Sequence, residues 1–313
     1  MRVLADSDTQ LIFQIGDPLD FSCGAAVHNA VFEYANLNAI CLSLTVKKGE
    51  LGPFCQAVKT LGICGFDVTM PHKSDVIEFC DEVDELSRAF NCVNHVDLRD
   101  GKLVGTALDG VGMCLNMLGA GIEIEGKRVM LLGAGGVAGP IAAECCKRGA
   151  TAIRIANRTV DKAKSICGVI DEYFSVETEF GSMDMDTLND FASRSDIIVQ
   201  CTCLGMAGSG MDYEDVSFVS KMPQGGAVAD VLYNPDKTKI LTYAEQQGYK
   251  IVNGLGMMIN QQKAMLKFHL DYDLETDCSD YAEEGLLVAV AQRQARAKRL
   301  ARQKAKLQGE KKE

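Results

Sequence analysis

The sequence predicts an α/β protein with an N-terminal substrate domain, built on a mostly parallel sheet, and a Rossmann-type dinucleotide-binding domain. Three observations support this fold class. Short apolar runs alternate with helix-length amphipathic segments, which is the rhythm of βαβ units. One of these runs leads directly into a glycine-rich turn and a helix. The 313 residues, 47% of them hydrophobic, provide enough apolar surface for two cores.

The apolar runs mark the expected strands in order along the chain. The seven runs cover residues 11–15, 40–46, 63–68, 129–133, 152–156, 196–201 and 227–232. Further strands are expected near 93–104. We place a domain boundary near residue 110, so that residues 1–110 form the substrate-binding and catalytic domain and residues 111–254 form the Rossmann domain. Helical spacing after residue 254 predicts that residues 255–290 complete the first domain. The acidic stretch 271–284 within it is predicted to be a loop or weak linker.

Charge and composition limit the classes of function that this chain can have. A net charge of −11 argues against a nucleic-acid-binding body. Residues 291–313, in contrast, hold nine Lys and Arg against two Glu, and we expect a basic, mobile tail there, with an anionic partner as the alternative. No run of about 18 apolar residues and no signal-peptide pattern is present, so a cytoplasmic protein without a membrane segment is expected. The 13 cysteines are predicted to be reduced thiols. Homo-oligomerisation stays open.

The run at 129–133 opens a predicted nucleotide site. Gly133, Gly135 and Ala138 follow it in the order that a dinucleotide-binding turn requires, and a helix comes next. Such a turn lets backbone N–H groups and the helix N-terminus approach a pyrophosphate. The predicted contacts are made by Gly133, Ala134, Gly135, Gly136 and Val137.

The end of the next strand predicts which dinucleotide binds. An NAD site usually carries Asp or Glu here to bond the ribose 2′-hydroxyl, whereas this strand ends in Asn157, Arg158 and Thr159. A guanidinium and a hydroxyl suit a 2′-phosphate, and Lys162 adds charge one helical turn on. The sequence therefore favours NADP over NAD, and no metal site is predicted.

Several separated motifs together resemble the shikimate and quinate dehydrogenase family, from Leu11 to about Leu270. The segment from Gly65 to Lys73 is similar to Gly-x-Asn-Val-Thr-x-Pro-x-Lys, and residues 89–96 to Gly-Ala-Val-Asn-Thr. Asp-Gly-Val-Gly at 109–112, the glycine-rich turn, and the segments CTCLGM, DVLYNPDKT and GLGMMINQ also match family motifs. The resemblance implies NADP-dependent hydride transfer between a ring ketone and the secondary alcohol of a cyclic hydroxy acid, such as shikimate.

The resemblance also implies roles for individual residues. Lys73 and Asp109 take the catalytic positions, and Gly254 lies by the nicotinamide. The implied substrate-binding residues are Ser22, Thr69, Asn94, Tyr233 and Gln261. From chemistry alone, a lysine beside a carboxylate can hold and move the hydroxyl proton, and we expect partial burial to lower the pKa of Lys73. Asp109 is also placed to cap a helix.

Four positions depart from the family pattern. Gly24 replaces one of two carboxylate-binding serines, Asp67 replaces an asparagine, and Ala107-Leu108 replace Asn-Thr. These changes predict a less polar wall and an extra negative charge in the pocket, so shikimate is expected to be a poorer substrate than a less hydroxylated ring acid. Two alternatives remain open. The chain acts on an amino-substituted or less hydroxylated ring, or it is a non-catalytic NADP-binding sensor.

Overall fold

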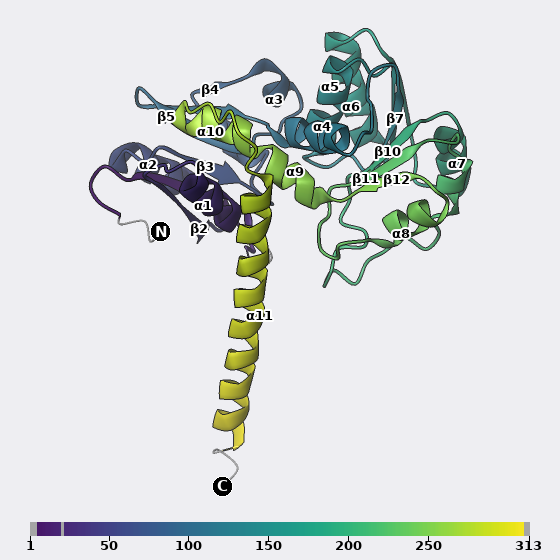
Figure 1. Ribbon diagram of the computed structural model, residues 1–313. Coiled ribbons are helices and arrows are strands. Elements are labelled where there is room, and N and C mark those ends of the chain that lie inside the picture. The colour runs from purple at the N-terminus through teal and green to yellow at the C-terminus, as the bar shows by residue number, and fades with distance from the viewer. Residues whose placement is uncertain (1–4, 20–21, 310–313) are drawn as a thin grey trace.

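The computed structural model describes residues 5–19 and 22–309, and it contains two six-stranded sheets side by side (Figure 1). The predicted strands are present. Three further strands were not predicted, and all three lie at sheet edges: β4 (Glu82–Val83), β9 (Glu177–Gly181) and β12 (Lys250–Val252). All 13 cysteines are free thiols, as predicted. Within the described chain no helix has the length and apolar character needed to cross a membrane.

The N-terminal sheet has the order β2-β1-β3-β5-β6-β4. Its strands are β1 (Gln10–Gly16), β2 (Ala39–Thr45), β3 (Gly65–Val68), β4 (Glu82–Val83), β5 (His95–Arg99) and β6 (Lys102–Thr106). The pairs β1–β2, β1–β3 and β4–β6 are parallel, whereas β5 runs antiparallel to both of its neighbours. The antiparallel β5 brings residues 94 and 95 level with the end of β3.

Helices cover both faces of this sheet. On one face α2 (Leu51–Leu61) and the short helix η1 (Asp75–Phe79) pack on Ile15 and Phe66. On the other face lie α1 (Gly24–Tyr34) and three C-terminal helices, α9 (Gly254–Asn260), α10 (Gln262–Leu270) and the start of α11 (Ser279–Gly309). The short α3 (Glu85–Ala89) precedes β5.

The second sheet is entirely parallel, with the order β12-β11-β10-β7-β8-β9, which is that of a Rossmann fold. Its strands are β7 (Arg128–Leu132), β8 (Ala152–Ala156), β9 (Glu177–Gly181), β10 (Ile197–Gln200), β11 (Ala227–Asp230) and β12 (Lys250–Val252). One face is covered by α4 (Asp109–Gly119), α5 (Ala138–Lys147) and α6 (Val160–Tyr173), the other by α7 (Met185–Ser193), η2 (Ser217–Lys221) and α8 (Lys239–Gln246).

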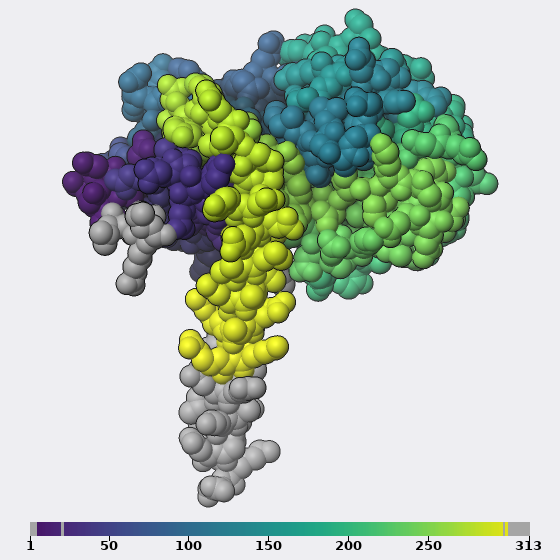
Figure 2. All heavy atoms as spheres, in the orientation of Figure 1, coloured from purple at the N-terminus to yellow at the C-terminus, as the bar shows by residue number. Residues whose placement is uncertain are grey.

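The C-terminal segment differs from the loop predicted over 271–284, because α11 begins at Ser279. Cys278, Ala282 and Leu286 are buried in the cluster that also holds α1, which explains why this acidic stretch becomes helical. Beyond it α11 continues to Gly309 and projects away from both sheets (Figure 1). Figure 2 shows the first turns of α11, in yellow, packed beside the N-terminal domain. Residues 310–313 of the predicted tail lie outside the described chain.

Candidate active site

Lys73 and Asp109 meet between the two sheets. Lys73 lies in the turn after β3, where its carbonyl accepts a hydrogen bond from the Val93 N–H (2.8 Å). Its Nζ donates to Asp109 Oδ2 at 2.5 Å, and Asp109 is only 4% exposed. The helix α4 begins at Asp109 with Leu108 in the capping position, so Asp109 is not the cap. Its carboxylate accepts the hydrogen bond from Lys73 Nζ instead.

The pKa of Lys73 shifts opposite to the expected direction. Burial is the largest single influence and lowers it, but the charge and hydrogen bond of Asp109 together with nearby Cys92 outweigh burial and hold the pKa above its ordinary value. The prediction of a lowered pKa was wrong because it counted desolvation without the close partner. A raised pKa favours the charged ammonium form of Lys73, which is consistent with the hydrogen bond that Nζ donates to Asp109.

Asn94 and Gln261 extend this pair into a polar chain. Asn94 Nδ2 donates to Asp109 Oδ1 at 3.0 Å, and Asn94 Oδ1 accepts from the Leu108 N–H at 2.7 Å. Gln261, in the break between α9 and α10, receives a longer bond from Asn94 Nδ2 at 3.5 Å. Four of the predicted site residues are thus connected, and Asn94 fixes the orientation of the Asp109 carboxylate.

The other predicted substrate residues lie half-buried on nearby segments. Ser22 precedes α1 and Thr69 follows β3 directly. Tyr233 follows β11 in the second domain and packs against the apolar cluster of the first, and burial raises its pKa. Within the described chain no hydrogen bond joins the side chains of Ser22 or Thr69 to Lys73 or Asp109, which leaves both hydroxyls available.

The glycine-rich turn joins β7 to α5 as predicted. Gly133 has a φ of 102°, which strains any residue with a side chain. A Cβ there would also lie 2.6 Å from Thr202 Cγ2 and clash with it. At Gly135 the corresponding space is open. Residues 133–137 therefore form a cradle in front of the N-terminus of α5, the arrangement that accepts a pyrophosphate.

The glycine-rich turn at residues 133–137 lies next to Lys73. A Cβ at Gly136 would be 3.6 Å from Lys73 Cδ, and the Gly136 carbonyl accepts a hydrogen bond from Cys92 Sγ at 2.7 Å. Burial raises the pKa of Cys92 to about 12, which keeps it a neutral thiol donor. This role of Cys92 was not predictable, because a lone buried cysteine belongs to no local motif.

The residues after β8 divide into two kinds. Asn157 accepts from the Ala134 N–H (3.1 Å) and donates to the Thr159 carbonyl (2.8 Å), so it braces the cradle. Arg158 and Lys162 are exposed, and in the described chain neither side chain has a hydrogen bond or ion pair. These two free cations beside the end of β8 fit an anionic 2′ substituent.

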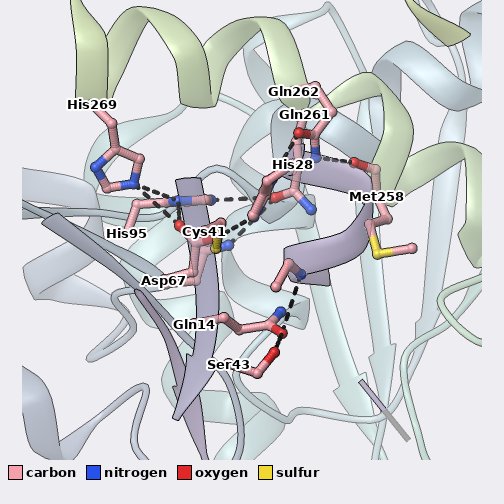
Figure 3. A network of polar contacts seen from close by, with 12 residues as sticks. Gln14, His28, Cys41, Ser43, Asp67, His95, Met258, Gln261, Gln262 and His269 are labelled. Atoms are coloured by element: carbon pink, nitrogen blue, oxygen red, sulfur yellow. Dashed lines mark hydrogen bonds and ion pairs between the residues drawn. The ribbon is translucent and has the colours of Figure 1, made fainter. Parts of the chain in front are cut away.

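Gln14 occupies the space left by Gly24. A Cβ at Gly24 would lie only 2.0 Å from Gln14 Nε2. Gln14 is 7% exposed, and its Oε1 accepts from the Ala25 N–H at 3.4 Å and Ser43 Oγ at 3.3 Å (Figure 3). The Gln14 amide, from β1, therefore takes the space that a side chain at position 24 would fill. The motif comparison missed this contact of Gln14.

We expect Gly24→Ser to destabilise the fold by about 1–3 kcal/mol, because the new side chain displaces a buried amide. The added Gln14→Ala substitution is expected to recover most of that loss, because it empties the contested space. Urea unfolding of both single variants and the double variant measures this coupling. Purely additive losses would contradict the contact.

Asp67 is not the free negative charge that the sequence predicted. It is 6% exposed, and its oxygens contact His28 Nε2, His95 Nδ1 (2.6 Å) and His269 Nε2 (3.1 Å) (Figure 3). Burial raises its pKa, but the histidines outweigh burial and hold it well below the usual range. The structure therefore gives no support for repulsion of a carboxylated substrate by Asp67. It gives none for pairing of Asp67 with an amino-substituted ring either.

Two sheets that meet at a nucleotide cradle and a buried lysine–aspartate pair define a two-domain protein of the Rossmann dehydrogenase class. Residues 14–96 match the family described as shikimate dehydrogenase substrate binding domain, and residues 117–206 match shikimate / quinate 5-dehydrogenase. A shikimate dehydrogenase (NADP(+)) of Alkaliphilus oremlandii is 37% identical over 86% of this chain and 94% of its own length. The chain belongs to the shikimate and quinate dehydrogenase family.

Solved structures agree with this family and show its breadth. Shikimate 5-dehydrogenase from Listeria monocytogenes, in complex with shikimate and NAD, superposes with a TM-score of 0.81 at 27% identity, covering 91% of this chain and 98% of that one. The 5-ketofructose reductase of Gluconobacter superposes with a TM-score of 0.79 at 28% identity, covering 91% and 100%.

Proposed function

We propose that this protein is an NADP-dependent oxidoreductase that interconverts a ring ketone and the secondary alcohol of a cyclic hydroxy acid of the shikimate class. The observation that carries the proposal is the buried contact between Lys73 and Asp109 beside the nucleotide cradle at Gly136. A binding-only protein has no use for this pair, which disfavours the NADP sensor. The names of the relatives support the same activity.

The side chains divide the proton chemistry between them. Bound NADP supplies the hydride donor or acceptor. In the reductive direction, charged Lys73 donates its proton to the carbonyl oxygen, and Asp109 holds its Nζ in place. In the oxidative direction the hydroxyl proton returns to this pair. Asn94 keeps the Asp109 carboxylate oriented throughout.

The two domains take separate ligands in this proposal. Residues 133–137 hold the pyrophosphate, and Arg158, Thr159 and Lys162 face the 2′-phosphate. Residues 1–110, completed by residues 255–290, hold the ring, with Ser22, Thr69, Tyr233 and Gln261 as its polar contacts. Gly254 opens α9 where the chain crosses back between them, the place proposed for the nicotinamide.

On the substrate side, two of the departures from the family pattern are compensated. Gln14 fills the place of a serine, and three histidines surround Asp67. Only Ala107-Leu108 stays without a polar replacement, since Leu108 packs against the apolar cluster of the first domain. We therefore include shikimate itself among the proposed substrates.

The test is a cofactor and substrate panel with the purified protein. Shikimate and quinate are offered with NADP or NAD, and 5-ketofructose with the reduced cofactors, while nicotinamide absorbance is followed. We expect oxidation of shikimate with NADP, at a higher kcat/KM than with NAD. Tight NADP binding without turnover of either ring acid would overturn the substrate class.

A further inference from the structure

Three of the chain's four histidines gather around one buried carboxylate (Figure 3). Asp67 comes from β3, His95 from β5 and His269 from the end of α10. Asp67 Oδ1, His95 Nδ1 and His269 Nε2 form a triangle with sides of 2.6, 3.1 and 3.2 Å. Relative exposures of 6%, 2% and 6% exclude bulk solvent from these residues.

We propose that Asp67, His95 and His269 bind one divalent transition-metal ion of the Zn²⁺ type. Two imidazole nitrogens and one carboxylate oxygen are ligands that such ions prefer. The site lies outside the proposed proton-transfer pair, and no part of the hydride-transfer proposal depends on it.

The dimensions of the triangle fit this assignment. Metal–ligand distances of about 2.0–2.2 Å place neighbouring ligand atoms about 2.9 Å apart at right angles and about 3.4 Å apart in a tetrahedron. The two sides that meet at His269 Nε2, 3.1 and 3.2 Å, fall in this range. The third side, 2.6 Å from Asp67 to His95, is a little shorter.

The outer nitrogens of the two histidines also have a geometry that suits metal ligands. His95 Nε2 faces Gln261 Oε1 at 3.5 Å, and His269 Nδ1 faces Asp97 Oδ1 at 3.6 Å, so each outer nitrogen points at an acceptor. In this orientation the inner nitrogen of each ring faces Asp67 Oδ1, and an imidazole nitrogen with a free lone pair there can bind a cation. The two inner nitrogens, His95 Nδ1 and His269 Nε2, lie 3.2 Å apart, close enough for both to bind one ion.

The outer partners resemble those that orient metal ligands in proteins. Carboxylate and amide oxygens face the outer nitrogens of the two histidines, and the second oxygen of Asp67 is held by His28. His28 is itself fixed by Gln262 Oε1, 2.7 Å from its Nδ1. Such partners set ring orientation before the ion arrives.

A metal here would hold α10 to the sheet and position Gln261. Gln261 contacts both His95 and Asn94, and Asn94 contacts Asp109. Gln261 would then act as a positioning residue between the metal site and the substrate pocket. The ion itself takes no step in the reaction.

The test uses the full chain without an affinity tag, expressed with added Zn²⁺ and also prepared metal-free, with no NADP or substrate present. We expect about one Zn²⁺ per chain by elemental analysis, and Co²⁺ absorption bands typical of nitrogen and oxygen ligands on replacement. His95→Gln and His269→Gln are each expected to weaken Zn²⁺ binding by roughly 100-fold or more.

The control is His72→Gln, which removes the fourth histidine. His72 is also buried, but its Nε2 faces the Val46 carbonyl at 2.7 Å, outside the cluster. This variant is expected to keep full Zn²⁺ content. Circular dichroism checks that each variant folds, and a Zn²⁺-dependent rise in the Tm of the unsubstituted chain serves as a second measurement. A chain that holds no stoichiometric Zn²⁺ and shows no Tm shift would overturn the proposal.

Discussion

Replacing Lys73 with alanine is expected to lower kcat by about 10²–10⁴-fold, because it removes the group that gives its proton to the carbonyl oxygen. Asp109→Asn keeps the shape and the hydrogen bond from Asn94 but loses the charge that holds the lysine, and we expect a loss of similar order. NADP affinity is expected to change little, since neither side chain belongs to the cradle at 133–137. Steady-state kinetics and cofactor titration measure the two effects separately.

A matched control is Lys102→Ala. Lys102 is an exposed lysine that is also ion-paired, to Glu82 at 2.7 Å, but it lies at the surface of β6. Its loss is expected to leave kcat and KM unchanged. An active Lys73→Ala protein would contradict the assigned role of the lysine.

Replacing Arg158 with alanine is expected to weaken NADP by about 10–100-fold and NAD hardly at all. The guanidinium is exposed and has no partner in the described chain, so its contribution depends on the 2′-phosphate that only NADP carries. Charge-assisted hydrogen bonds of this kind are worth about 1.5–3 kcal/mol. Titration of both cofactors, with Arg296→Ala on α11 as an exposed control, measures the difference. Equal losses for NADP and NAD would contradict the assignment.

Local patterns in the sequence were sufficient for most of the fold. Parallel strands buried on both faces appear as continuous apolar runs, which is why β7, β8, β10 and β11 follow directly from residues 129–133, 152–156, 196–201 and 227–232. The edge strand β9 has the sequence ETEFG and lacks such a run. Helix α11 begins inside an acidic stretch, because burial against α1 outweighs local charge.

The candidate site was predictable where one segment carries both the residue and its context. Lys73, Asp109 and the glycine-rich turn lie within short motifs. The environment of Asp67 was not predictable in this way, because His28, His95 and His269 come from segments up to 241 residues apart that only the folded chain brings together. Gln14 was missed for the same reason, since its contact with Gly24 crosses from a strand to a helix.

The central claim is that Lys73 and Asp109 act as one unit, and a double-mutant cycle on kcat tests it most directly. Lys73→Ala, Asp109→Asn and the double variant are compared with the unsubstituted protein, using shikimate and NADP. We predict that the double variant loses little more than the worse single variant, because either change already disables the pair joined at 2.5 Å. A double variant whose loss equals the product of the two single losses would contradict the claim.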